Sequence, residues 1–81
     1  MEEGEVGRVM WRSRRGLLEL DLRLVPFARD AYSGLDAQTR RAYCELLEED
    51  DPDVLAWLTG LEPVPPRFAS IVALVTAYRH G

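Results

Sequence analysis

The chain has 81 residues, a formal net charge of −4, 47% hydrophobic residues and 30% charged residues. This length predicts one domain, residues 1–81, with a thin core. The composition excludes a disordered chain, and the absence of any uncharged apolar run of about 18 residues excludes a membrane-spanning helix. The acidic charge argues against nucleic acid as the main partner, because binding nucleic acid usually requires a basic surface.

The two ends of the chain carry no sign of a functional site. The opening sequence MEEGEV lacks the basic start and apolar centre of a secretory signal, so we expect a bacterial, cytoplasmic protein. The only histidine, His80, is next to last. We expect the first few residues and the last two to be flexible.

The first half predicts two helices, over residues 5–14 and 17–32, with Gly16 between them. The second segment is ambiguous. From Leu18 to Leu24 its leucines alternate with charged residues, as in a strand, but they also recur at three- and four-residue steps, as in a helix. Leu, Glu and Arg favour helix, and no second strand is available for pairing. We therefore predict a helix that Pro26 bends or interrupts.

A third helix is predicted over residues 37–49, with Asp36 as its capping residue. Its apolar stripe includes Tyr43 and Leu46, and Cys44 lies beside that stripe. A single cysteine excludes an internal disulfide. We expect a buried structural thiol at this position, with a catalytic nucleophile as the alternative.

Two more helices complete an all-α, compact bundle of about five short helices. The run Asp51-Pro52-Asp53 predicts a helix start, with Asp51 as the cap, and Gly60 predicts the end of that helix. The last helix is expected to begin near Pro66, after the connector LEPVPP, with an apolar stripe from Phe68 to Tyr78.

The residues just before Gly16 are the first candidate site, and they are Trp11, Arg12, Arg14 and Arg15. On a helix, Arg15 and Glu19 would lie on one face, four positions apart. A surface pair of this kind stabilises by only about 0.3–0.5 kcal/mol. Gly16 allows either a simple turn or a close approach by another backbone. Trp11 is interpreted as a core residue or as an interface anchor.

The acidic run over residues 48–53 is the second candidate site. It is interpreted as a solvated turn and helix start, or as a docking surface for a basic patch on a partner. The sequence contains no glycine-rich phosphate loop and no His/Cys cluster with zinc-ligand spacing. We therefore expect neither a metal site nor an enzyme.

Two motifs resemble the signatures of the succinate dehydrogenase assembly factors. The first is R-G-x-x-E, here Arg15 to Glu19, followed by Leu20-Asp21. The second is LLEEDDPDVLAWLTG at residues 46–60, with its acidic pair, Pro-Asp, Trp-Leu and glycine. Pro26-Phe27 and Tyr43 also match, so that the resemblance extends from about residue 8 to residue 79.

The resemblance implies a bundle of five short helices, which favours helix for residues 17–32. It also implies a non-enzymatic protein that binds the flavoprotein subunit of succinate dehydrogenase, or of fumarate reductase. There it promotes covalent attachment of FAD, through a histidine of the flavoprotein, and it binds no cofactor itself. No membrane insertion is expected.

Roles for individual residues follow from the resemblance as hypotheses. Gly16 would permit close backbone approach, and Arg15 and Glu19 would make directional contacts near the flavin site of the partner. Charge complementarity and further contacts are assigned to Trp11, Arg12, Arg14, Asp50 and Asp51.

Three alternatives from other classes stay open. One is an antitoxin that neutralises a toxin partner. Another is a nucleic-acid binder that uses Trp11 and the arginines up to Arg15. The third is a flavin-binding enzyme, which no phosphate-binding loop supports.

Overall fold

The computed structural model describes residues 3–78, so that the flexible ends expected from the sequence, and His80, lie outside the described residues. Within that range the chain is all α-helical, as predicted. Its α-helices are α1 (Glu3–Arg12), α2 (Leu18–Asp30), α3 (Ala37–Leu46), α4 (Asp51–Thr59) and α5 (Ala69–Ala77). Two 3-10 turns, Tyr32–Gly34 and Pro66–Phe68, precede α3 and α5. None of the helices in residues 3–78 is both long enough and apolar enough to cross a membrane.

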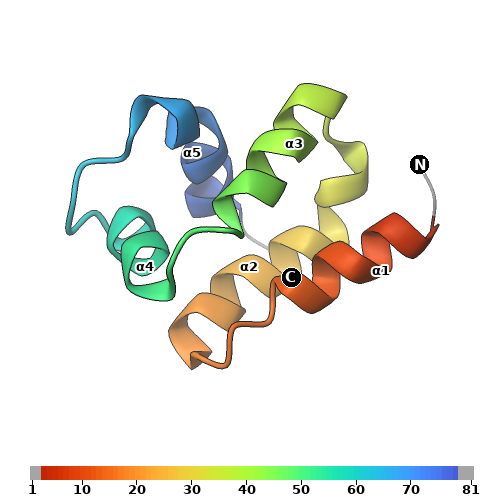
Figure 1. Cartoon of the computed structure of the whole chain (residues 1–81), viewed down its shortest axis with the longest axis horizontal. Helices are drawn as coiled ribbons and strands as arrows, with labels where there is room; N and C mark the ends of the chain where they lie inside the picture. The colour runs from red at the N-terminus through yellow and green to blue at the C-terminus, as the bar shows by residue number, and fades with distance from the viewer. Residues whose placement is uncertain (1–2, 79–81) are drawn as a thin grey trace.

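The helix α2 lies at the centre of the packing. It contacts α1, α4 and α5, while α3 packs on α5. In Figure 1, α1 and α2 run side by side in opposite directions along one side of the molecule, and α3, α4 and α5 lie on the other. The connection between α1 and α2 is therefore a tight turn at one end of this pair.

The leucine-rich segment forms a helix, which confirms the choice of helix over strand. Leu20, Leu24 and Phe27 are at most 2% exposed and supply the centre of the core. Leu18 and Leu22 are 74% and 64% exposed, because they lie on the opposite side of α2. Of the two expected effects of Pro26, a bend or an interruption, the interruption is wrong, since α2 continues to Asp30 with Pro26 buried inside it.

Two capping predictions are confirmed and one is wrong. The carboxylate of Asp36 accepts a 2.8 Å hydrogen bond from the Thr39 backbone N–H. Gly60 ends α4 in the left-handed conformation, with φ of 79°. The cap of α4, however, is Asp50 and not Asp51, which instead lies in the first turn of that helix.

Three helices end earlier than predicted. The helix α1 ends at Arg12, where 14 was expected, and α2 ends at Asp30, where 32 was expected. The helix α3 ends at Leu46, where 49 was expected. After α3, the backbone carbonyls of Leu47 and Glu49 accept hydrogen bonds from the Arg15 side chain, far away in the sequence. A contact of this range cannot be read from local propensity.

Cys44 is half-buried and packs against the core, whereas a buried structural thiol was expected. Its sulfur lies 3.5 Å from the Tyr32 hydroxyl, which donates a 2.8 Å hydrogen bond to the carboxylate of Glu5. Burial, with the hydrogen bonds to Cys44 and Glu5, raises the pKa of Tyr32.

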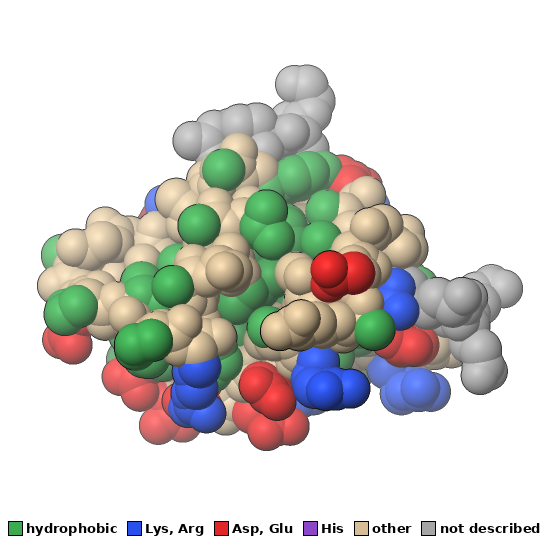
Figure 2. All heavy atoms as spheres, turned by 90° about the horizontal axis from the view of Figure 1, so that it is seen from above, with side chains coloured by type: hydrophobic (Ala, Val, Ile, Leu, Met, Phe, Trp, Pro, Cys, Tyr) green, Lys and Arg blue, Asp and Glu red, His purple; other side chains and the backbone are tan. Residues whose placement is uncertain are grey.

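Charged side chains are unevenly distributed over the surface. Seen from above, apolar side chains occupy much of the middle of this face, and arginines and acidic residues gather along one edge (Figure 2). Opposite charges that lie close together attract one another, and several of these side chains form ion pairs within the chain.

Candidate functional site

The first part of the site is the Gly16 turn, residues 13–17, which joins α1 to α2. Gly16 has φ of +84°, a conformation that L-amino acids adopt only with strain. A Cβ placed on Gly16 would meet nothing within 4 Å. The turn explains why a glycine is present, and the backbone there is open to solvent.

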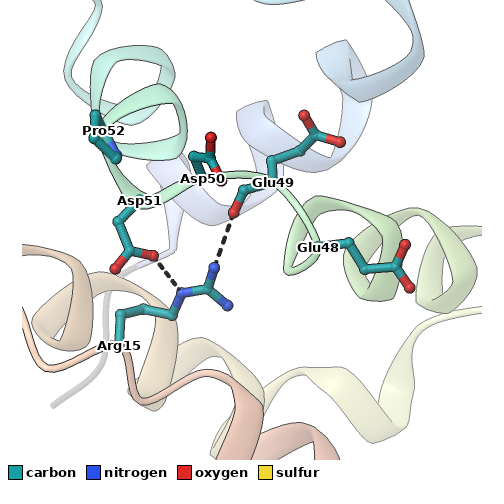
Figure 3. Close-up of a pocket in the computed structure, with 6 residues that line it drawn as sticks. All are labelled: Arg15, Glu48, Glu49, Asp50, Asp51 and Pro52. Carbon is teal, nitrogen blue, oxygen red and sulfur yellow. Dashed lines mark hydrogen bonds and ion pairs between the residues drawn. The ribbon is translucent and has the colours of Figure 1, made fainter.

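Arg15 points into the protein and binds the segment that joins α3 to α4 (Figure 3). Its Nε donates to Asp51 Oδ1 at 2.7 Å and its Nη2 donates to the Glu49 carbonyl at 2.9 Å. Its Nη1 donates to the carbonyls of Leu47 at 2.8 Å and Arg12 at 3.1 Å. Only 14% of the side chain is exposed. We call these four hydrogen bonds the Arg15 clamp.

The expected placement of Arg15 and Glu19 on one helical face is wrong, because the helix is broken at Gly16. Glu19 lies in the first turn of α2 and pairs with Arg23 at 3.3 Å. In this order the acid precedes the base, which is the favourable arrangement along a helix. The acidic residue of α2 that contacts Arg15 is Asp21, whose Oδ1 accepts a 2.7 Å hydrogen bond from the Arg15 backbone N–H.

The α3–α4 loop, residues 47–50, is also held by two other arginines. Arg67 Nη2 pairs with Glu49 Oε2 at 3.2 Å, and Arg12 Nη2 lies 3.9 Å from Glu48 Oε2. Asp50 is exposed, and within residues 3–78 its carboxylate has neither a hydrogen bond nor an ion pair. The loop borders an open hollow of about 450 Å³. Its lining residues are Arg15, Glu48, Glu49, Asp50, Asp51 and Pro52.

The acidic side chains around this hollow are therefore largely neutralised by arginines of the same chain. Across residues 3–78, no group of three or more His, Cys, Asp or Glu side chains is placed to hold a metal ion. The acidic run was interpreted as a solvated turn and helix start, or as a docking surface. As a docking surface it would depend on Asp50, since Asp51 is already bound to Arg15.

The other expected contact residues lie on the surface near the Gly16 turn. Trp11 is 74% exposed, so it is not a core residue. It borders a hollow of about 500 Å³ on the outer side of α1, together with Gly4, Gly7 and Arg8. Arg14 is exposed, and no described residue forms an ion pair with it.

Ser13 is a structural residue of the site that sequence reasoning missed. It is fully buried, and its Oγ lies 2.7 Å from the Tyr43 hydroxyl and 2.8 Å from the Val9 carbonyl. Each of the two hydroxyl groups has one proton to donate. Both contacts are hydrogen bonds when Tyr43 donates to Ser13 Oγ and Ser13 donates to the Val9 carbonyl. The carbonyl of Leu24, at 3.3 Å, is a longer alternative acceptor for Tyr43. The only signal in the sequence is a serine at a helix end, four residues after the carbonyl it binds.

Tyr43 connects the Gly16 turn to the core. It is completely buried, and burial raises the pKa of Tyr43 to about 12, although the hydrogen bond with Ser13 acts in the opposite direction. Ser13 and Arg15 thus anchor the turn from both sides, through a neutral hydrogen bond in the core and a charged clamp near the surface.

Comparisons with known proteins show the family of this chain. Residues 7–79 match the family described as "Flavinator of succinate dehydrogenase". The FAD assembly factor SdhE of Pseudomonas aeruginosa is 48% identical over 56 residues, which cover 69% of this chain and 67% of that protein. The proteins of the same name in Pseudomonas putida and Shewanella oneidensis are 37% and 40% identical over 76 residues, which cover 93% of this chain and 90% and 93% of theirs. Both sequence motifs, residues 15–21 and 46–60, fall within the matched range. The chain belongs to the flavinator of succinate dehydrogenase family, whose members are assembly factors and not enzymes.

Proposed function

We propose that this chain binds the flavoprotein subunit of succinate dehydrogenase and promotes the covalent attachment of FAD to it, without holding a flavin of its own. The family match over residues 7–79 is the observation that carries this proposal. Its relatives are bacterial proteins named FAD assembly factors, and we place the encounter in the bacterial cytoplasm. The flavoprotein of fumarate reductase is a second candidate target of the same chemistry.

The proposed contact surface consists of exposed residues of α1, the Gly16 turn, the first turn of α2 and the α3–α4 loop. Gly16 offers bare backbone with open space above it, and Trp11 offers a large apolar side chain. Aromatic side chains of this size are typical anchors of protein interfaces. Arg14 and Asp50 add charges that are unpaired within the described residues. Glu19, with 58% of its side chain exposed, remains accessible beside Arg23.

The proposed role is to bind and orient, and the chemistry belongs to the partner. In the attachment of FAD, the 8α-methyl group of the flavin loses a proton, and a histidine nitrogen of the flavoprotein bonds to that methyl carbon. The electron pair of the broken C–H bond reduces the flavin ring, on which negative charge develops. Such a step requires the nucleophile, the flavin and the stabilising charges to be held in register. A small protein that holds the flavoprotein in its competent arrangement accelerates the reaction without supplying a reacting group.

Co-expression tests this function. The flavoprotein of the same organism is produced with and without this chain, denatured, and separated on a gel, where covalently bound flavin fluoresces. Fluorescence that rises with this chain is the expected result. Equal fluorescence in both samples, with the flavoprotein folded and present in equal amounts, would refute the proposal, and a search for a toxin partner would follow.

A further inference from the structure

Arg15 belongs to the R-G-x-x-E motif, but only 14% of its side chain is exposed. We propose that Arg15 is a positioning residue: it locks the Gly16 turn and the α3–α4 loop into one rigid docking surface, and it touches neither the flavoprotein nor its flavin. This inference rests on the proposed function and specifies how one residue of the motif serves it.

The hydrogen bonds of Arg15 are the first support. A guanidinium has five N–H donors in a fixed fork. The Arg15 clamp uses Nε, Nη1 and Nη2, with acceptors in Asp51, Leu47, Glu49 and Arg12. Four of the five N–H groups are used in this way, and 14% of the side chain is exposed, which leaves a partner one N–H of Nη2 unless some of these bonds break. A residue that recognises a partner directly is expected to keep its donors available, as Arg14 does.

The segments that the clamp joins are the second support. Asp51 lies 36 residues from Arg15, in the first turn of α4, and the Leu47 carbonyl lies just after α3. The positive charge of Arg15 interacts favourably with the carbonyl end of α3, and the negative charge of Asp51 interacts favourably with the amide end of α4. Arg15 thus fixes both sides of the α3–α4 loop, while its own backbone precedes Gly16.

The surface that results is the third support. Arg67 holds the Glu49 side chain, and Arg15 holds Asp51, which leaves Asp50 as an exposed carboxylate between two clamped residues. The clamp holds the loop that carries this carboxylate against Arg15, the residue that precedes Gly16. The matching partner surface would bring a hydrogen-bond donor or a cation to Asp50 and its own backbone to Gly16.

Hydrogen exchange on the isolated protein tests the clamp without any partner. The amides of Glu48 and Glu49 donate to the carbonyls of Glu45 and Leu46, both at 3.1 Å. Arg15→Gln and Asp51→Asn are each expected to accelerate exchange at these two amides by about tenfold or more, as expected for loss of a charged hydrogen bond. Core amides of α2 should change much less. Arg14→Gln is the matched control and should change neither.

A titration of the flavinylation rate then tests the positioning role. Arg15→Gln and Asp51→Asn should each raise the concentration of this protein needed for half-maximal rate by about tenfold, equivalent to about 1.4 kcal/mol. The maximal rate at saturation should be retained, and the double variant should be no worse than the more impaired single variant. The concentrations are corrected for the folded fraction of each variant, measured by circular dichroism, so that global unfolding is not mistaken for weak docking.

The possible failures are distinguishable. A lower maximal rate for Arg15→Gln alone, with Asp51→Asn behaving as the wild type, would mean that Arg15 acts on the partner or its flavin, and would overturn the inference. Unchanged exchange at Glu48 and Glu49 in both variants would also overturn it. A wild-type protein that does not stimulate flavinylation at all would refute the proposed function, and the docking role of Arg15 with it.

Discussion

Replacing Gly16 with arginine separates the folding role of this residue from its role in docking. The positive φ of 84° makes any L-residue strained there, at a cost of about 1–2 kcal/mol. No steric term adds to this cost, since a Cβ would meet nothing within 4 Å. For a domain of this size, about 1 kcal/mol lowers the melting temperature by about 4–8 °C. We therefore expect Gly16→Arg to fold, with a modestly lower melting temperature.

Gly60 provides a matched control for this strain. Its φ is 79°, and a Cβ there would also meet nothing within 4 Å. Gly60 ends α4, outside the Gly16 turn and the α3–α4 loop. Gly60→Arg should therefore lose a similar amount of stability and introduce the same side chain, while leaving the proposed contact surface unchanged.

The assay is flavinylation of the co-expressed flavoprotein, read as in-gel flavin fluorescence, together with thermal melts of both variants. Gly16→Arg is expected to abolish the stimulation, because a long side chain occupies the space that the partner backbone would enter. Gly60→Arg is expected to retain it. Equal loss in both variants would trace the defect to stability alone, and full activity of Gly16→Arg would refute close backbone approach at this turn.

Three further predictions concern the core and the outer side of α1. Ser13→Ala should lower the free energy of unfolding by about 1–2 kcal/mol, because Tyr43 loses its shorter hydrogen bond. Urea unfolding should show a lower midpoint with an unchanged slope, and an unchanged midpoint would contradict this account. Raising the pH should destabilise the protein between pH 10 and about 12. The unfolded state releases the Tyr43 proton near the ordinary pKa of 10.0, whereas the folded state keeps that proton until about pH 12. This difference removes about 3 kcal/mol of stability over that range. Tyr43→Phe should make this alkaline loss shallower, and parallel curves for the two proteins would contradict the assignment. Trp11→Ala should change the free energy of unfolding by no more than about 0.5 kcal/mol, because the side chain is 74% exposed, yet weaken association with the flavoprotein by about tenfold or more in a binding titration; unchanged affinity would remove Trp11 from the contact surface.

The amino-acid sequence by itself determined the helical elements and some of their ends. The three- and four-residue recurrence of leucines placed Leu20 and Leu24 in the core, and both are completely buried. Asp36 and Gly60 marked helix ends correctly, because capping depends on residues within about one helical turn. Interactions of this range are readable from the order of residues.

Only the tertiary structure decided what the residues of the motif contact. Arg15 and Glu19 read as neighbours on a helix, yet Arg15 binds Asp51 and the α3–α4 loop, while Glu19 binds Arg23. The hydrogen bond between Ser13 and Tyr43 spans 30 residues and likewise left no periodic pattern. The direction of a side chain beyond the end of a helix is determined by which distant segments pack beside it. For that reason the sequence located the Gly16 turn, and the packing of α1 and α2 beside the α3–α4 loop directed Arg15 inward.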